Sequence, residues 1–449
     1  MKVQTMSATK ISQVVVIGAG IFGVSTAVQL QRRGIAVTLL NDGPAGNGAS
    51  GRSLSWLNSA RMRSDDYHRL RMAGIDRYRT LANRVGKVDW LSFEGGLTWD
   101  ADDAKNEIAA AYAHEVSLAY DALHLRPDDV AGVTPGVDAA TITPQGAIFN
   151  PGEGWVDLPA LIAHLLKEFS ANGGTLVTDQ GAAKVIVENG RAVGAVTADG
   201  RAFRARAVAS NLNPKLLYQR IVAPQHLDDD TRQRIAAYRC GSGTFRMNVA
   251  LAELPDFTAA PGTALQPHHQ SGILVGHSLA YFEQAYFDAK SRAHNAGWAR
   301  APVVEVVISS TLDDTLAPPG RHVASLFCQQ VNPQVEGGWD AHRDTVARLM
   351  IDTVDAFAPN FARSVLGYEA LSPLDLERRF GLVGGDIFHG ALGLDQLFST
   401  RPLLGQAHYR GAVPGLYLCG SGSHPGGGVT GLPGRNAARE ILRDRRAFH

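Results

Sequence analysis

The feature that most constrains the fold is an apolar run followed at once by three spaced glycines near the start of the sequence. Residues 14–17 are β-branched and apolar, which is typical of a buried parallel strand. The spacing Gly-x-Gly-x-x-Gly that follows permits a tight turn, close approach of a pyrophosphate, and close packing of the next helix. A second apolar run at residues 35–40 completes a β-α-β unit, which predicts binding of the ADP half of a dinucleotide. The expected contacts are Gly18, Gly20, Ile21, Phe22 and Gly23.

The residues after the second strand indicate which dinucleotide is bound. An acid is expected about 20 residues after the glycines, on the ribose hydroxyls. Asn41 stands there and Asp42 follows, so either Asn41 acts as a neutral partner or Asp42 turns inward. No Arg follows directly, which disfavours a 2′-phosphate. The small, hydroxyl-rich segment 48–53 favours FAD over NAD, although an ordinary polar loop is the alternative. Its expected pyrophosphate contacts are Ser50, Gly51 and Arg52.

A second strand, glycine loop and helix lie near the end of the sequence. Residues 415–420 read as a strand, residues 421–431 as a glycine-rich loop, and residues 433–443 as a helix. Such a loop presents backbone N–H groups and the positive end of the helix dipole, which stabilise negative charge at the pyrimidine end of a reduced flavin. The alternative is a glycine-rich surface turn. The expected contacts are Gly420, Ser421, Gly428 and Val429, and Ala182, which begins another strand, is expected to meet the adenine through its backbone.

Composition narrows the class of protein. With 449 residues and 45% hydrophobic content, the chain can bury a sizeable core. The formal net charge is zero, which gives no electrostatic case for binding nucleic acid or an anionic membrane. Three cysteines that lie far apart indicate a reducing compartment and no metal site. No signal peptide or run of transmembrane length is expected, so a cytoplasmic location is the default expectation.

Two family resemblances rest on motifs along the chain. Residues 14 to about 200 resemble the D-amino-acid-oxidase-like (DAO) flavoproteins, which include glycine and sarcosine oxidases. Residues from about 203 onward resemble the phytoene-desaturase-related flavoproteins, and among these the pyridine nucleotide-disulfide oxidoreductase domain-containing type. The motifs for the first are residues 18–23, 48–52 and 154–159, and those for the second are residues 210–215, 384–390, 394–398 and 419–428.

Both resemblances imply FAD and a glutathione-reductase-like fold. The expected class is α/β, with a Rossmann-type FAD-binding domain interleaved with an α+β substrate domain on a mixed or antiparallel sheet. The FAD-binding domain is expected to be discontinuous. Its expected segments are 1–85, 150–213 and 395–449, and those of the substrate domain are 86–149 and 214–394.

Catalytic residues are harder to identify than cofactor contacts. Hydride transfer to a flavin requires positioning of the substrate more than a strong acid or base. Asp386 and His389 lie three residues apart in a glycine-flanked segment, and they are the candidates for orienting a substrate. The alternative is a turn in which both side chains bind backbone groups.

Three functions remain open from the sequence. The favoured one is FAD-dependent removal of a hydride from the C–N bond of an amine or amino acid. The others are desaturase-like dehydrogenation of C–C bonds in an apolar substrate, which would involve peripheral membrane contact, and a flavin-containing regulatory or interaction protein. The oxidant is O₂, a quinone or an electron-carrier protein. Lys290 is the one lysine after Lys215, so it alone offers an ammonium in that half to assist reaction with O₂.

Overall fold

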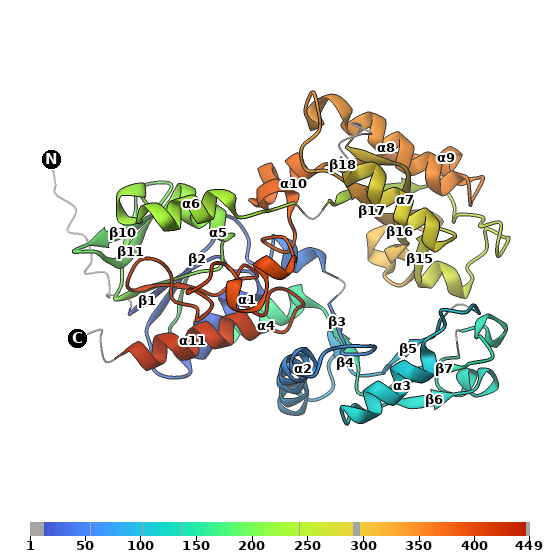
Figure 1. Cartoon of the computed structure of the whole chain (residues 1–449), viewed down its shortest axis with the longest axis horizontal. Coiled ribbons are helices and arrows are strands. Elements are labelled where there is room, and N and C mark those ends of the chain that lie inside the picture. The colour runs from blue at the N-terminus through green and yellow to red at the C-terminus, as the bar shows by residue number, and fades with distance from the viewer. Residues whose placement is uncertain are drawn as a thin grey trace. The chain divides into compact units, whose positions relative to one another are not determined.

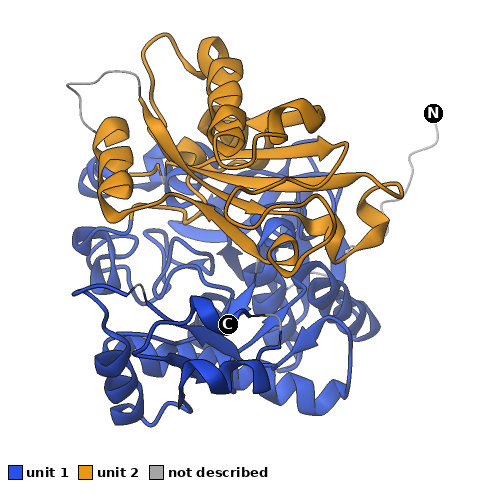
Figure 2. Cartoon of the chain, turned by 90° about the vertical axis from the view of Figure 1, so that its right-hand side faces the viewer, with its two compact units in different colours: residues 1–238, 392–449 blue, residues 239–391 orange. Residues whose placement is uncertain are grey.

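The computed structural model describes residues 13–53, 55–100, 102–135, 137–241, 243–290 and 297–445. The chain divides into two compact units (Figure 2). The first contains residues 1–238 and 392–449, and the second contains residues 239–391. The first unit is therefore built from two stretches of chain that are far apart in sequence.

A five-stranded parallel sheet forms the centre of the first unit (Figure 1). Its strand order is β19-β13-β1-β2-β9, and every neighbouring pair is parallel. Val14 of β1 pairs with Ala207 on one side and with Val37 on the other. All of β1 is buried, as its continuous β-branched sequence predicts. The strands are β1 (Val14–Ile17), β2 (Val37–Leu40), β9 (Thr175–Val177), β13 (Ala207–Ser210) and β19 (Leu416–Leu418).

Three helices pack around this sheet. They are α1 (Ile21–Gln31), α4 (Leu158–Ala171) and α11 (Leu432–Asp444). Helices α1 and α11 approach closely at Gly434, where a Cβ would lie 2.4 Å from the carbonyl oxygen of Phe22. Helix α4 begins at an acidic N-cap, with the Asp157 carboxylate accepting from the N–H of Ala160 at 3.1 Å.

The rest of the first unit consists of three small antiparallel sheets and further helices. The sheets have the strand orders β10-β11-β12, β3-β8-β4 and β5-β7-β6. Their strands are β3 (Trp56–Leu57), β4 (Leu91–Ser92), β5 (Gly96–Thr98), β6 (Leu123–Leu125), β7 (Ala147–Asn150), β8 (Gly154–Val156), β10 (Ala182–Glu188), β11 (Arg191–Thr197) and β12 (Ala202–Arg204). The helices are α2 (Asp65–Val85), α3 (Ile108–Ser117), α5 (Pro214–Leu216) and α6 (Asp229–Ala237).

The second unit is built on a five-stranded antiparallel sheet with the order β15-β16-β17-β14-β18. Its strands are β14 (Phe245–Leu251), β15 (Gly272–Val275), β16 (Trp298–Val307), β17 (His322–Val331) and β18 (Val365–Leu371). Its helices are α7 (Leu279–Lys290), α8 (Trp339–Asp355), α9 (Phe361–Ser364) and α10 (Pro373–Phe380). The alternating strand residues Phe245, Met247 and Val249 are buried in a core that also contains Trp339 and Met350 of α8.

The chain thus has mixed α/β content with parallel and antiparallel sheets, in agreement with the expected class. Residues 86–149 and 214–238, which were expected in the substrate domain, belong to the first compact unit. Helix α3 ends at Ser117, and residues 123–125 then pair as a strand with β7.

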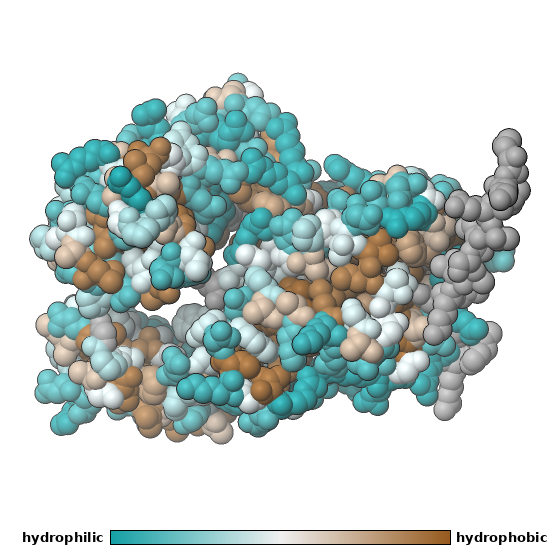
Figure 3. All heavy atoms as spheres, turned by 180° about the vertical axis from the view of Figure 1, so that it is seen from behind, coloured by the Kyte–Doolittle hydropathy of each residue, from teal (hydrophilic) through white to brown (hydrophobic). Residues whose placement is uncertain are grey.

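The described surface mixes hydrophilic and hydrophobic residues, and the hydrophobic ones gather in local patches (Figure 3). No helix among the described residues combines the length and the apolar character needed to cross a bilayer.

Candidate functional site

The glycine loop between β1 and α1 leaves no room for side chains. A Cβ on Gly23 would lie 1.7 Å from the carbonyl oxygen of Gly18, and one on Gly20 would lie 3.2 Å from Ser50 Oγ. Gly18 has a φ of 95°, a conformation that favours glycine. Helix α1 therefore starts at a loop without projecting side chains, as a pyrophosphate site requires.

Ser50 and its neighbours lie at the same helix N-terminus. The Ser50 hydroxyl accepts from the backbone N–H of Ile21 at 3.0 Å, and Gly20, the N-cap residue, contributes no side-chain cap. A Cβ on Gly51 would lie 2.6 Å from the carbonyl oxygen of Gly46. Arg52 is exposed, and its guanidinium donates to the carbonyl oxygens of its own loop, at 3.0 Å for Gly48. The structure therefore brings Ser50 to the glycine loop and binds Arg52 to residues 47–48.

Asn41 is bound to the glycine loop itself. Its Oδ1 accepts from the N–H of Ala19 at 2.7 Å, while its Nδ2 donates to the carbonyl oxygens of Gly43 and Pro44 at 2.9 and 3.1 Å. Asp42 is exposed and lies against Gly181, where a Cβ would be 2.8 Å from the Asp42 Cβ.

Of the two ribose candidates, the Asn41 amide is bound within the loop, whereas the Asp42 carboxylate is exposed. It lies beside the residue that precedes Ala182, the start of β10. The expected ribose and adenine positions are therefore adjacent.

Asn211, at the end of β13, joins the two glycine loops, and the sequence interpretation gave it no role in cofactor binding. Its side chain faces Gly18, Gly20 and Gly23, with Nδ2 3.3 Å from the Cβ position of Gly20. On its other side, a Cβ on Gly420 would lie 2.6 Å from the Asn211 carbonyl oxygen. The signal that could have found it is its place directly after a buried strand, where ligand contacts occur in such sheets.

The second glycine loop follows β19 and is held by a buried arginine. The Arg401 side chain is 0% exposed, and its Nε donates to the carbonyl oxygen of Ser421 at 2.9 Å. Ser423 is buried, and its hydroxyl has no hydrogen-bond partner among the described residues. A buried polar group without a partner indicates a place for a ligand group or a water molecule.

The backbone before α11 is strained. Val429 has a φ of 65°, which is rare for a β-branched residue, and its carbonyl oxygen accepts from the Tyr78 hydroxyl at 2.5 Å. Burial raises the pKa of Tyr78, so this hydroxyl stays protonated as a donor. Gly428 and Gly431 also have positive φ values, and Gly431 caps α11 without a side chain. The first N–H of this helix, that of Leu432, instead donates to Thr430 Oγ1 at 3.3 Å.

The candidate catalytic residues lie in the second unit. The buried Asp386 carboxylate accepts from the N–H groups of Gly241 and Phe388, both at 2.8 Å. His389 is half-buried with a φ of 60°. Burial lowers the pKa of Lys290, while the charge of Asp386 raises it.

Asp386 and His389 lie in one turn, where the N–H of His389 donates to the carbonyl oxygen of Asp386 at 3.3 Å. The Asp386 carboxylate is used by two N–H groups, one within the turn and one at Gly241. The catalytic role of the two residues stays a prediction.

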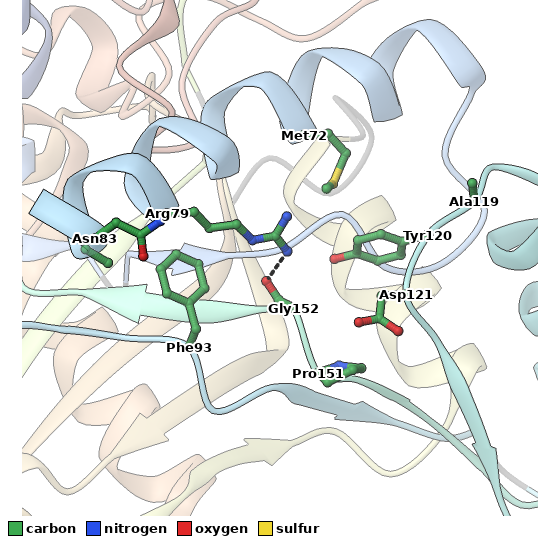
Figure 4. Close-up of a pocket in the computed structure, with 10 residues that line it drawn as sticks. Met72, Arg79, Asn83, Phe93, Ala119, Tyr120, Asp121, Pro151 and Gly152 are labelled. Carbon is green, nitrogen blue, oxygen red and sulfur yellow. Dashed lines mark hydrogen bonds between the residues drawn. The ribbon is translucent and has the colours of Figure 1, made fainter. Parts of the chain in front are cut away.

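A cavity of about 540 Å³ opens in the first unit beside Gly152 (Figure 4). Arg79 Nη2 donates to the carbonyl oxygen of Gly152 at 2.9 Å, and Tyr120 and Asp121 also line the cavity. The Tyr120 hydroxyl donates to the buried Glu153 carboxylate at 2.7 Å, and burial raises the pKa of Glu153. None of the predicted site residues lines this cavity.

The residues of the first unit fit a dinucleotide. Glycines exclude side chains from the loop before α1, Asn211 lies between the two glycine loops, and the buried Ser423 hydroxyl has no partner among the described residues. FAD bound there would have Gly20, Ile21 and Ser50 as candidate pyrophosphate contacts. The individual cofactor contacts stay predictions. Among the described residues, no cluster of three or more His, Cys, Asp or Glu side chains is arranged to hold a metal ion.

Comparisons with known proteins identify related chains. The FAD dependent oxidoreductase (DAO) family pattern matches residues 13–331. Pyridine nucleotide-disulfide oxidoreductase domain-containing protein 2 of Rattus norvegicus is 42% identical over 377 residues, which cover 82% of this chain and 62% of the relative. A lycopene-forming phytoene desaturase of Paracoccus is 25% identical over 300 residues, which cover 63% of this chain and 54% of the relative. The chain thus matches less than two thirds of the length of these relatives.

One solved structure of similar fold is glycine oxidase from Geobacillus kaustophilus. The TM-score is 0.55 and the sequence identity 14%, and the match covers 97% of this chain and 95% of the other. At this identity the likeness concerns the fold alone.

Proposed function

Because the chain belongs to the FAD-dependent oxidoreductase (DAO) family, we propose that it removes a hydride from the C–N bond of an amine or amino acid. FAD, when bound, supplies the acceptor for that hydride. The protein's part is to hold the cofactor through the glycine loops and to position the substrate.

The observation that carries this proposal is the extent of the family match. The sequence resemblance to the DAO flavoproteins was expected to end near residue 200, but the family match continues to residue 331. It therefore includes β14 and β17, two central strands of the antiparallel sheet in the second unit. The match thus covers more than the nucleotide-binding half, which favours the chemistry of this family over that of the desaturases.

We assign different roles to the two residues of the turn. Asp386 is a positioning residue, because its carboxylate binds two backbone N–H groups, that of Phe388 within the turn and that of the distant Gly241. His389 is the candidate for substrate orientation. Lys290 is the candidate ammonium for assisting O₂, and a quinone or an electron-carrier protein stays open as oxidant.

The 25% identity with a phytoene desaturase supports a second candidate, dehydrogenation of C–C bonds in an apolar substrate. Anaerobic absorbance spectra of the purified holoenzyme distinguish the two. We expect loss of the oxidised flavin band with at least one member of a panel of amines and amino acids, and no change with apolar polyenes. Reduction by polyenes alone would favour desaturation, and reduction by neither panel would favour a regulatory role.

A further inference from the structure

Arginines from three helices surround a groove on the first unit. The groove has a volume of about 240 Å³, and Arg32, Arg77, Arg84 and Arg435 line it. It adjoins a larger hollow of about 690 Å³ through the shared residues Gln29 and Arg435. The hollow adds Arg33, Arg439, Arg443 and Arg445, and no acidic residue lines either space. We call the smaller space the arginine groove.

Five of the eight arginines that line the two spaces are not neutralised by the protein. Arg32 and Arg84 pair with Glu168 at 2.5 and 3.7 Å, and Arg443 pairs with Glu440 at 2.5 Å. Within the part of the chain that the structure describes, the other five side chains have no ion pair or hydrogen bond: Arg33, Arg77, Arg435, Arg439 and Arg445. Arg435 is half-buried, and burial together with repulsion from Arg77 and Arg439 lowers its pKa. Arg77 and Arg439 are exposed, so water screens part of this repulsion, and an anion bound between the three arginines would relieve the rest.

The floor of the arginine groove is apolar, in contrast to its rim. Helices α1, α2 and α4 contribute Val28, Leu81, Leu161 and Leu165 to the lining. Ser25 adds a hydroxyl group that can donate to an anion, whereas the Thr80 hydroxyl donates to the carbonyl oxygen of Asp76 at 2.7 Å. A ligand that fits this lining has an apolar body and a compact group with more than one negative charge.

We propose that the arginine groove binds a phosphate monoester whose organic part is apolar. A phosphate monoester carries between one and two negative charges at neutral pH and presents three acceptor oxygens. The planar forks of arginine match this geometry better than they match a single hydroxyl or carbonyl group. The zero formal net charge of the chain does not argue against such a site, because the arginines are concentrated locally.

Isothermal titration of the FAD-loaded protein with phenyl phosphate tests the site. We expect one phenyl phosphate per chain, at least tenfold weaker binding of inorganic phosphate, and no measurable binding of benzyl alcohol. Arg435→Gln is expected to weaken phenyl phosphate binding by tenfold or more, since a charge-assisted contact of about 1.5–3 kcal/mol is lost. Arg348→Gln is the matched control, because it removes an exposed arginine from α8 in the second unit.

Thermal melting separates a binding role of Arg435 from a structural one. Since its guanidinium is repelled by two others, Arg435→Gln is expected to keep or raise the melting temperature without phosphate and to abolish the rise that phenyl phosphate causes. Absence of binding to the wild type, or equal binding to Arg435→Gln, would overturn the proposal.

Vesicles identify the source of the phosphate. If vesicles containing phosphatidic acid, whose headgroup is a phosphate monoester, bind the wild type but not Arg435→Gln, the phosphate belongs to a lipid headgroup. If phenyl phosphate binds and vesicles do not, it belongs to a soluble ester.

Discussion

Two glycine-flanked loops of this protein differ in how they use their backbone donors. In residues 18–23 the glycines exclude side chains, and the N–H groups of Ala19 and Ile21 donate to Asn41 and Ser50, whereas the N–H of Gly20 has no hydrogen bond within the described residues. In residues 384–390 the Asp386 carboxylate accepts from two N–H groups, one within the turn and one at Gly241. The first loop thus leaves the N–H of Gly20 for a ligand, whereas the second satisfies donors with its own carboxylate. A high glycine content alone therefore does not indicate a binding loop.

The largest expected effect on FAD content comes from closing the first loop. In Gly23→Ala the added Cβ would lie 1.7 Å from the Gly18 carbonyl oxygen, so the backbone of the loop must move. Overpacking of this kind costs about 1–3 kcal/mol or more. We expect FAD content to fall at least tenfold, as measured by FAD released from the denatured protein.

Gly34→Ala is the control for a glycine that only permits a turn. Gly34 has a φ of 77° and nothing within 4 Å of its Cβ position, so the variant should lose about 1–2 kcal/mol of stability and keep its FAD. Full FAD retention in Gly23→Ala would show that the first loop does not hold the cofactor.

His389 tests whether the second loop also has a ligand-facing group, and the expected effect is on the rate of flavin reduction and not on FAD content. If His389 orients the substrate, His389→Ala should slow anaerobic flavin reduction by about 10²-fold in single-turnover measurements and leave FAD content unchanged. His389→Asn should be equally slow, although asparagine tolerates the φ of 60°. Recovery of the rate in His389→Asn would instead assign the residue a structural role.

Asp386→Ala is expected to weaken the second loop without affecting the first. It leaves the N–H groups of Gly241 and Phe388 without their acceptor, which costs about 1–3 kcal/mol of unfolding free energy. FAD content should stay constant, since the expected FAD contacts all lie in the first unit. Asp344→Ala, which removes an exposed carboxylate from α8, is the control and should melt like the wild type. A loss of FAD in Asp386→Ala would contradict the assignment.

Local sequence signals predicted the first loop, because its whole cause lies within a few residues. A buried strand, three glycines and a helix are contiguous in the chain, and β1, α1 and β2 form where the pattern places them. The strand, loop and helix at the other end were predicted for the same reason, with α11 at Leu432–Asp444 instead of 433–443.

The remaining features depend on contacts between residues that are far apart in sequence. One of the two N–H groups that donate to the Asp386 carboxylate belongs to Gly241, which lies 145 residues away. Asn211 reaches the first loop only because β13 pairs with β1. The arginine groove forms because α1, α2, α4 and α11 meet, so the zero net charge of the sequence gave no sign of it. Spacing along the chain does not contain this information.

The smallest expected effect is on stability and concerns His424, in the glycine-rich loop before α11. Burial and the charge of Arg401 hold the pKa of His424 below its usual value of about 6.5. The unfolded chain therefore binds a proton at a higher pH than the folded protein does, so the stabilisation from neutral His424 is full above about pH 7 and is lost as the pH falls below about 6.5. Because His424 is half-buried, we expect the loss to stay under about 1 kcal/mol. His424→Asn removes the titrating group, so its stability should fall less than that of the wild type between pH 7.5 and about 5.5, as measured by thermal melting of both proteins. Equal losses in the two proteins would show that His424 is protonated as easily when folded as when unfolded, which would place its side chain in water and not in the loop interior.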